Sequence, residues 1–252
     1  MPRGLPVTCL FSHKCGGDTC DLPNPCTPGK PCLSCRLRTA LKRHKIRLLV
    51  DPMRPGDDLR TRMQTFDFDS LLFLISEESL NSGPCTIERE TAQDRGRPIF
   101  TVLQSGRLPD EYRNRLCMKV AELDAPQGVS KLANAIHEHV LIRQHLRILK
   151  TEASPSDATR RLARGLYERD SSVLAEHIGE LESIYCHNTD DYTRHWMAWA
   201  IEHTGARDAV AVLERLKVSE TAPYPAEGIR RAIAKLKNVV NGGNHASQAS
   251  KE

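Results

Sequence analysis

The sequence predicts an α/β protein, in which a flavodoxin-like, five-stranded parallel sheet is followed by an all-α C-terminal domain. Short, nearly unbroken apolar runs alternate with segments of helical spacing through the first 145 residues. Strands that lack polar alternation are buried on both faces, which is typical of a parallel sheet covered by helices on both sides. After residue 150 only helical stripes remain. These three observations define the fold class.

Five apolar runs predict the strands, and segments with apolar steps of three and four predict the helices between them. Leu59, Met63 and Phe66 form one such helical stripe, and Leu132, Ile136 and Val140 form the last. In a doubly wound sheet the ligand crevice lies beyond the carboxyl ends of the strands, so we expect a site there. The predicted strands are "VTCLF" (7–11), "IRLLV" (46–50), "SLLFLIS" (70–76), "PIFTVL" (98–103) and the weaker "KVAEL" (119–123).

The domain boundaries follow from changes in pattern. We expect a first domain at 1–148 with a Cys-rich insertion at about 14–35, and a linker at 149–156 that contains Pro155. The segment 157–240 resembles HEAT-type helical repeats in "HWMAWAIEHTGARDAVAVLERL" and "AEGIRRAIAKL", with both tryptophans interpreted as core. The last residues, 241–252, are polar and Gly-rich, and we expect a flexible tail.

Composition excludes several classes of protein. Hydrophobic residues make up 39% and charged residues 27% of the 252 residues, as in ordinary globular proteins. No apolar stretch approaches the roughly 20 residues that a membrane span needs. The first residues lack a signal-peptide pattern, so we expect a cytoplasmic protein. The net charge of +4 is mild and its basic residues are dispersed, which argues against nucleic acid as the main partner.

Cysteines are concentrated in the first 35 residues, where six of the nine occur. Cys32 and Cys35 form the one C-x-x-C pair, and Cys20 and Cys26 precede it, so these four are the candidate ligands of a structural zinc ion. Only one of the two close pairs that zinc sites commonly use is present. Reactive thiols and a segment without metal therefore remain open as alternatives.

Four segments, in order, resemble the Toll/interleukin-1 receptor (TIR) domain. "CLFSHK" resembles its first strand, and "RLLVDPMRPGDDL" its second strand and BB loop. "FDSLLFLISEESLNS" resembles its third strand, and "SGPCTIERETAQDRGRPIFTV" its third helix and fourth strand. Together they cover about 140 residues.

The resemblance implies an activity, cleavage of the bond between nicotinamide and ribose in NAD, with a linear or cyclic product. Glu88 aligns with the catalytic carboxylate of enzymatic TIR domains. The resemblance also places five residues around NAD: Ser12, His13, Asp51, Ser82 and Cys85. Two of them have simpler structural roles as alternatives, Ser82 as the N-cap of the third helix and Cys85 as a small buried residue. Its BB-loop residues, Arg54, Pro55, Gly56 and Asp57, would contact other TIR domains. Such proteins act in immune, cell-death or antiphage signalling.

Two departures from the family fall near this site. Pro84 stands where the family has Trp, and the segment "CGGDTCDLPNPCTPGKPC" lengthens the first loop. A non-catalytic scaffold that signals by TIR–TIR assembly is therefore the alternative function. Glu88 itself has an alternative role as a solvated glutamate in the first turns of a helix, where the helix dipole favours acidic residues. Glu90 lies on another face, where we expect it to be solvated.

Overall fold

A computed structural model describes residues 6–12, 33–49, 58–112, 117–152 and 156–248, with the side chains of 239–248 left undescribed. The chain divides into two compact units at Val140 and Leu141, and each is described by itself. None of the described helices is both long and apolar enough to cross a membrane.

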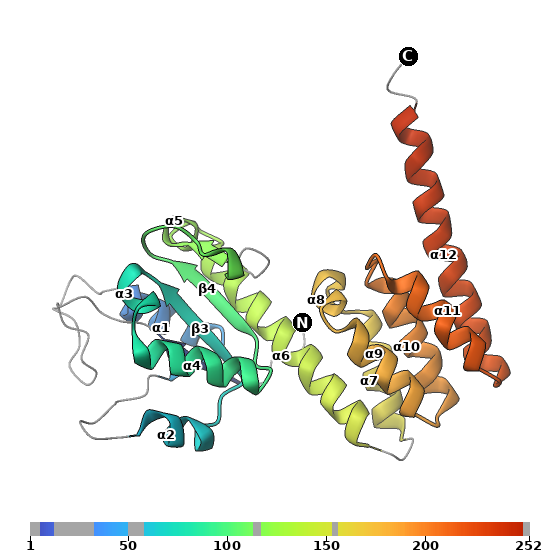
Figure 1. The fold of residues 1–252 in the computed structure, drawn as a ribbon, viewed down its shortest axis with the longest axis horizontal. Coiled ribbons are helices and arrows are strands. Elements are labelled where there is room, and N and C mark those ends of the chain that lie inside the picture. Colours follow the sequence, from blue (N-terminus) through green and yellow to red (C-terminus); the bar gives the residue numbers. More distant parts are fainter. Residues whose placement is uncertain (1–5, 13–32, 50–57, 113–116, 153–155, 249–252) are drawn as a thin grey trace. The chain divides into compact units, whose positions relative to one another are not determined.

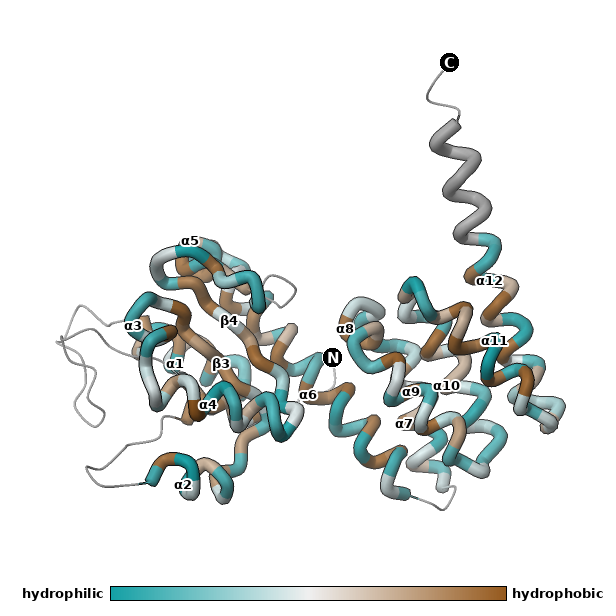
Figure 2. The backbone as a smooth tube through the Cα atoms, viewed as in Figure 1, coloured by the Kyte–Doolittle hydropathy of each residue, from teal (hydrophilic) through white to brown (hydrophobic). Residues whose placement is uncertain are grey.

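The first unit is built on five parallel strands in the order β2-β1-β3-β4-β5. This is the strand order of flavodoxin-like doubly wound sheets, so the predicted α/β class and parallel sheet are confirmed. Figure 2 shows the apolar character of its strands. The strands are β1 (Val7–Ser12), β2 (Ile46–Leu49), β3 (Ser70–Ile75), β4 (Ile99–Leu103) and β5 (Cys117–Lys119).

Helices cover both faces of this sheet, and each face has its own core (Figure 1). On one face, Leu72 and Leu74 of β3 pack with α1 (Leu33–Arg43) and the first half of α6 (Gly128–Thr151). On the other face, the alternate residues of β3 pack with α2 (Leu59–Thr65) and α4 (Gly83–Asp94). Because side chains alternate along a strand, a strand covered on both sides is apolar at every position. Shorter elements complete the unit: α3 (Glu77–Leu80), the 3₁₀ turn η1 (Asp110–Tyr112) and α5 (Val120–Leu123).

The weakest predicted strand differs from the observed one. The run 119–123 was expected to be a strand, but β5 ends at Lys119 and α5 occupies Val120–Leu123. Val120, Ala121, Glu122 and Leu123 include three good helix formers. Glu122 Oε2 also accepts a hydrogen bond from the Lys119 backbone N–H, as a residue in the first turn of a helix does.

The described residues of the second unit form helices joined by turns, with no strand among them. This agrees with the helical pattern predicted after residue 150. Its core is contributed by all six of its own helices and by the second half of α6. The expected end of the first domain at 148 and part of the expected linker thus fall within α6. The helices are α7 (Asp157–Tyr167), α8 (Ser171–Ala175), α9 (Ile178–His187), α10 (Asp191–His203), α11 (Ala209–Ser219) and α12 (Pro223–Gln248). Helix α12 continues past residue 240, where a flexible tail was expected.

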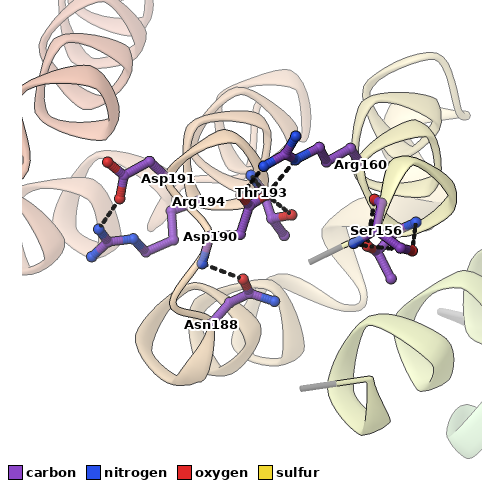
Figure 3. Close-up of polar contacts among 8 residues, drawn as sticks. Ser156, Arg160, Asn188, Asp190, Asp191, Thr193 and Arg194 are labelled. Carbon is purple, nitrogen blue, oxygen red and sulfur yellow. Dashed lines mark hydrogen bonds and ion pairs between the residues drawn. The ribbon is translucent and has the colours of Figure 1, made fainter. Parts of the chain in front are cut away.

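Polar side chains fix the start of α10 within this unit (Figure 3). Asp190 caps the helix by accepting from the Thr193 backbone N–H at 3.0 Å, and the Thr193 hydroxyl donates to the same carboxylate oxygen at 2.8 Å. Arg160 of α7 pairs with Asp190 at 2.8 Å. These contacts join α7 to α10 at a carboxylate that is only 7% exposed.

Candidate functional site

The site begins at the carboxyl end of β1. Ser12 is the last residue of that strand, and it aligns with Phe73 of β3, which in turn aligns with Thr101 of β4. All three side chains point to the sheet face that α4 covers, since Leu10, Leu71 and Ile99 two positions earlier belong to the core on that face. Ser12 and Thr101 are fully buried. A row of two hydroxyls flanking an aromatic ring therefore lies beneath α4.

The first turn of α4 lies over this row. Ser82 occupies the N-cap position, as expected, but its side chain makes no capping hydrogen bond. A capping side chain accepts from the N–H of the second or third helical residue. Pro84 holds the second position and has no N–H, so half of the capping geometry is unavailable. The Ser82 side chain is nevertheless buried.

Cys85 links α4 to β1. Its thiol is 2% exposed, and burial raises its pKa, an effect that Ser82 and Ser12 beside the sulfur partly oppose. Glu88, three residues along on the same buried face of α4, raises the pKa of Cys85 further through its charge. No hydrogen bond of standard length and angle reaches Ser12 Oγ from the described residues. Cys85 is therefore a protonated, neutral thiol that packs in the core, as expected for a small buried residue.

Glu88 faces inward. Its spacing of three from Cys85 and four to Ala92 places all three on the buried face of α4, and the glutamate is only 9% exposed. The alternative of a solvated helix-start glutamate is therefore wrong for Glu88. Glu90 shows the contrast, because its side chain is 47% exposed and pairs with Arg60 on α2 at 2.9 Å. Glu90 thus lies on another face, as expected, and is about half exposed where a solvated residue was expected.

Arg89 is a candidate site residue that the sequence analysis missed. Its guanidinium donates to the Tyr112 hydroxyl at 2.6 Å and to Thr86 Oγ1 at 3.1 Å, and it lies 5.0 Å from the centre of the Phe73 ring. The side chain is only 14% exposed, and the carboxylate of Glu111 lies 3.5 Å away. A largely buried cation, on the residue that follows Glu88, therefore lies above Phe73 in the middle of the hydroxyl row.

Tyr112 is the second missed residue. It belongs to η1, is 2% exposed, and its ring lies 6.0 Å from that of Phe73. Burial raises the pKa of Tyr112, while hydrogen bonding by Arg89 opposes the rise. The hydroxyl therefore stays protonated, and the loop after β4 is tied to α4. Apart from the basic residue next to Glu88, no sequence pattern pointed to this pair, because Arg89 and Tyr112 are 23 residues apart.

Several predicted site residues lie outside the described residues. They are His13 and Asp51, the BB-loop residues 54–57, and the proposed zinc ligands Cys20, Cys26 and Cys32. Cys35 is described, and it lies partly buried in α1. Within the described ranges, no group of three or more His, Cys, Asp or Glu side chains could hold a metal ion. The zinc site stays a prediction from the sequence.

Comparison of the chain with models of protein families, with curated proteins and with solved structures found no match. The resemblance to TIR domains therefore rests on the sequence motifs alone. What the geometry adds is local. Polar groups gather where α4 begins, beside the carboxyl end of β1. They are the Cys85 thiol, the Ser12 and Ser82 hydroxyls, the Glu88 carboxylate and the Arg89 guanidinium.

Proposed function

We propose that the first unit is a TIR-type NAD⁺ nucleosidase in which Glu88 supplies the catalytic carboxylate. The observation that carries the proposal is the inward orientation of Glu88, 9% exposed, beside Cys85 and the end of β1. An ordinary helix-start glutamate would point to water, as Glu90 does. The motif order that resembles a TIR domain supplies the reaction, and the position at the carboxyl ends of strands supplies the location.

The chemistry needs one carboxylate. Nicotinamide in NAD⁺ is cationic, so when the C–N bond breaks its electron pair returns to the ring nitrogen and the base leaves neutral. No general acid is required, in contrast to ordinary glycoside hydrolysis, which needs a second carboxyl group. The ribosyl cation that forms is stabilised by a nearby negative charge in a low-dielectric site. Water then adds to the ribosyl carbon and releases a proton, or the adenine of the same molecule adds and closes a ring.

The neighbours of Glu88 serve to fix it. Arg89 donates back to the Cys85 carbonyl at 3.4 Å and forward to Tyr112, so the helical turn that carries Glu88 is held from both sides. A carboxylate held this way is oriented before substrate binds, which is the condition for electrostatic stabilisation without reorganisation. We assign Arg89 and Tyr112 to positioning and Glu88 to the reaction.

The remaining parts of the chain complete this proposal. Residues 54–57 would join TIR domains to one another, and the helical second unit would respond to a trigger or keep the TIR domains apart. The setting would be immune or cell-death signalling, as the resemblance implies. Structural zinc in the Cys-rich segment belongs to the same proposal.

A non-catalytic scaffold is the second candidate, and two observations favour it. Ser12 and Cys85, which a nucleosidase would place beside the nucleotide, are 0% and 2% exposed. Pro84 also removes the aromatic surface that the family has at this position. Under this alternative the cluster serves only to hold α4 on the sheet.

Two matched substitutions on one helix separate the candidates. The full chain, Glu88→Gln and Glu90→Gln are each incubated with NAD⁺ at high protein concentration, and nicotinamide release is followed by chromatography. An enzyme should release nicotinamide in the wild type and in Glu90→Gln, while Glu88→Gln falls by about 10²–10³-fold, the usual loss for one preorganised electrostatic group.

The other outcomes also decide. Release that survives in Glu88→Gln at the wild-type rate would refute the assignment of Glu88. No release from any of the three, together with unchanged self-association of Glu88→Gln by light scattering, would favour the scaffold. Circular dichroism of each variant checks that the fold is retained.

A further inference from the structure

A basic surface covers the outward side of α1 and the turn that follows it. Residues 33–49 contain six lysines and arginines and no aspartate or glutamate, although over the whole chain acidic residues reduce the net charge to +4. Helix α1 buries two leucines against the sheet, so its charged side chains are exposed on the other side. The basic surface consists of Arg38, Lys42, Arg43 and Lys45, all of them exposed.

The basic surface lies away from the candidate site. Because the strands are parallel, Lys45, which directly precedes β2, lies at the amino end of the sheet, whereas Ser12 lies at the carboxyl end. Arg47 is exposed as well, but it alternates along β2 with Ile46 and Leu48, which belong to the core beneath α1. Arg47 therefore points to the opposite face of the sheet and is not part of the basic surface.

The cations of the basic surface pair with no acidic side chain in the parts of the chain that the structure describes. Arg38 and Lys42 are one turn apart, and like charges at this spacing destabilise a helix. The helix dipole favours cations in the last turn, which accounts for Lys42 and Arg43 but not for Arg38. Helix α12 differs, because its exposed cations pair with acids at 2.6–3.0 Å: Arg230 and Arg231 with Glu227, Lys235 with Glu202, and Lys237 with Glu214.

Lys45 stands where the backbone favours glycine. Its φ is 60°, in the left-handed region, and among the described residues no other non-glycine residue has a positive φ. The turns that follow α4 and α10 have Gly96 and Gly205 there, with φ of 55° and 57°. A residue with a Cβ is disfavoured in this conformation. A lysine that is kept at such a position indicates that its side chain contributes something other than stability.

We propose that the basic surface binds the phosphate backbone of duplex nucleic acid without reading its sequence. A duplex carries about one negative charge per 1.7 Å of its axis, and lysine and arginine bind it by displacing condensed counterions. Arg38 and Lys42 are about 6 Å apart along the axis of α1, so the four cations meet several phosphates at once. This binding is separate from the reaction proposed for Glu88.

The composition of the basic surface distinguishes a duplex from other anionic partners. Single strands are held by stacking on aromatic rings, and residues 33–49 contain no Phe, Tyr or Trp. Stable membrane binding needs an apolar anchor besides a basic patch, and protein interfaces have an apolar centre. Among the described residues, the exposed large hydrophobic side chains are Val218 and Tyr224, both in the second unit. A duplex backbone requires neither rings nor apolar anchors.

The experiment titrates the full chain into a labelled DNA duplex of about 20 base pairs and arbitrary sequence, and follows fluorescence anisotropy. Four phosphate contacts predict that affinity falls by about 10²-fold between about 50 and about 200 mM salt. The double variant Lys42→Gln with Arg43→Gln keeps two contacts, so it should bind more weakly at the lower salt and lose only about tenfold over the same range. Arg230→Gln with Lys237→Gln removes the same charge from α12 and should bind as the wild type does.

Lys45→Gly separates binding from folding. It should weaken binding and reduce the salt slope by about one, while its thermal unfolding midpoint by circular dichroism stays at or above that of the wild type, because glycine adopts the left-handed conformation freely. Wild-type affinity in Lys45→Gly would overturn the proposal. So would the absence of wild-type binding at about 50 mM salt, or an equal loss of affinity in the α12 control.

The same titration distinguishes the other anionic partners. A single strand of the same length, and vesicles of phosphatidylcholine with phosphatidylserine, are each compared with the duplex at equal salt. The duplex should bind most tightly. Tighter binding to the single strand or to the vesicles would overturn the assignment to duplex nucleic acid.

Discussion

Replacing Asp190 with Ala should destabilise the second unit by about 2 kcal/mol. Loss of the N-cap acceptor costs about 1 kcal/mol, and loss of the hydrogen bond from the buried Thr193 hydroxyl costs about 1 kcal/mol more. The ion pair with Arg160 adds little, because the arginine side chain is 43% exposed and water screens its charge. Figure 3 shows all three contacts meeting at one carboxylate.

Urea unfolding followed by tryptophan fluorescence measures this effect cleanly, because both tryptophans belong to the second unit. A change of about 2 kcal/mol corresponds to a midpoint lower by roughly 1 M in urea. Asp190→Asn is the informative comparison, because asparagine caps helices as well as aspartate does and should stay close to the wild type. Asp191→Ala is the neighbouring control, since it leaves the N-cap intact and removes a half-exposed carboxylate that pairs with Arg194.

The same contact carries a pH dependence with a defined sign. Although burial alone would raise it, the pKa of Asp190 is lowered by hydrogen bonds from Arg160 and Thr193. A lowered folded-state pKa gives stability that is complete above the unfolded value of about 3.9 and is lost as pH falls through the folded value. The reasoning is refuted if Asp190→Asn costs as much as Asp190→Ala, or if Asp190→Ala behaves like Asp191→Ala.

Three further predictions concern other parts of the chain. Gly128→Ala should severely destabilise the first unit, because a Cβ there would lie 1.9 Å from the backbone oxygen of Glu122. Circular dichroism during thermal unfolding measures the loss of stability, and a transition at the wild-type temperature would contradict the prediction. Tyr185→Phe should lower the free energy of unfolding of the second unit by about 1–3 kcal/mol, because the tyrosine hydroxyl donates to the buried carboxylate of Glu220. Burial raises the pKa of Tyr185, and the pairing with Glu220 raises it further. Urea unfolding measures the effect, and an unchanged midpoint would show that the bond contributes nothing. Among the described cysteines, the exposed Cys186 should react first with a thiol reagent, and Cys9, whose pKa burial raises to about 12, only on unfolding; peptide mapping by mass spectrometry would reveal the opposite order.

The sheet was predictable from sequence because its signal is local. Each strand from β1 to β4 coincides with a nearly unbroken apolar run, and its ends lie within one residue of the expected ones. The strand order, by contrast, followed from the fold class. At β5 the run was too short to distinguish strand from helix, and helix propensity decided for residues 120–123. Whether such a short segment forms a strand or a helix also depends on its packing in the fold, which its own residues do not indicate.

The candidate site was predictable only in part, for a similar reason. Spacing identified Glu88 and Cys85 as neighbours on one helical face, but spacing does not say which face is buried. Ser82 was placed correctly at the N-cap, yet the proline two residues later removed one of the amides it would cap. Arg89 and Tyr112 meet only through the folded chain, so no local pattern could pair them.

The inner face of α4 gives the strongest physical reason to treat this region as functional. At its successive buried positions the helix carries Cys85, Glu88 and Ala92, where a helix selected for packing carries large apolar side chains. The buried face of α10 in the second unit, with Met197 and Ile201, is of that ordinary kind.

Polar contacts hold α4 in place instead. Arg89 bonds to Tyr112, and Arg95 donates to the carbonyl oxygens of Met63 and Phe66 at the end of α2, each at 2.7 Å. Exposed and half-buried contacts of this kind stabilise a helix less than the burial of Leu or Phe, each of which contributes about 1.5–3 kcal/mol. Natural proteins depart from efficient packing mainly where a site requires it. A fold that gives up apolar burial under one helix, and keeps a carboxylate there, agrees with the catalytic role that we propose for Glu88.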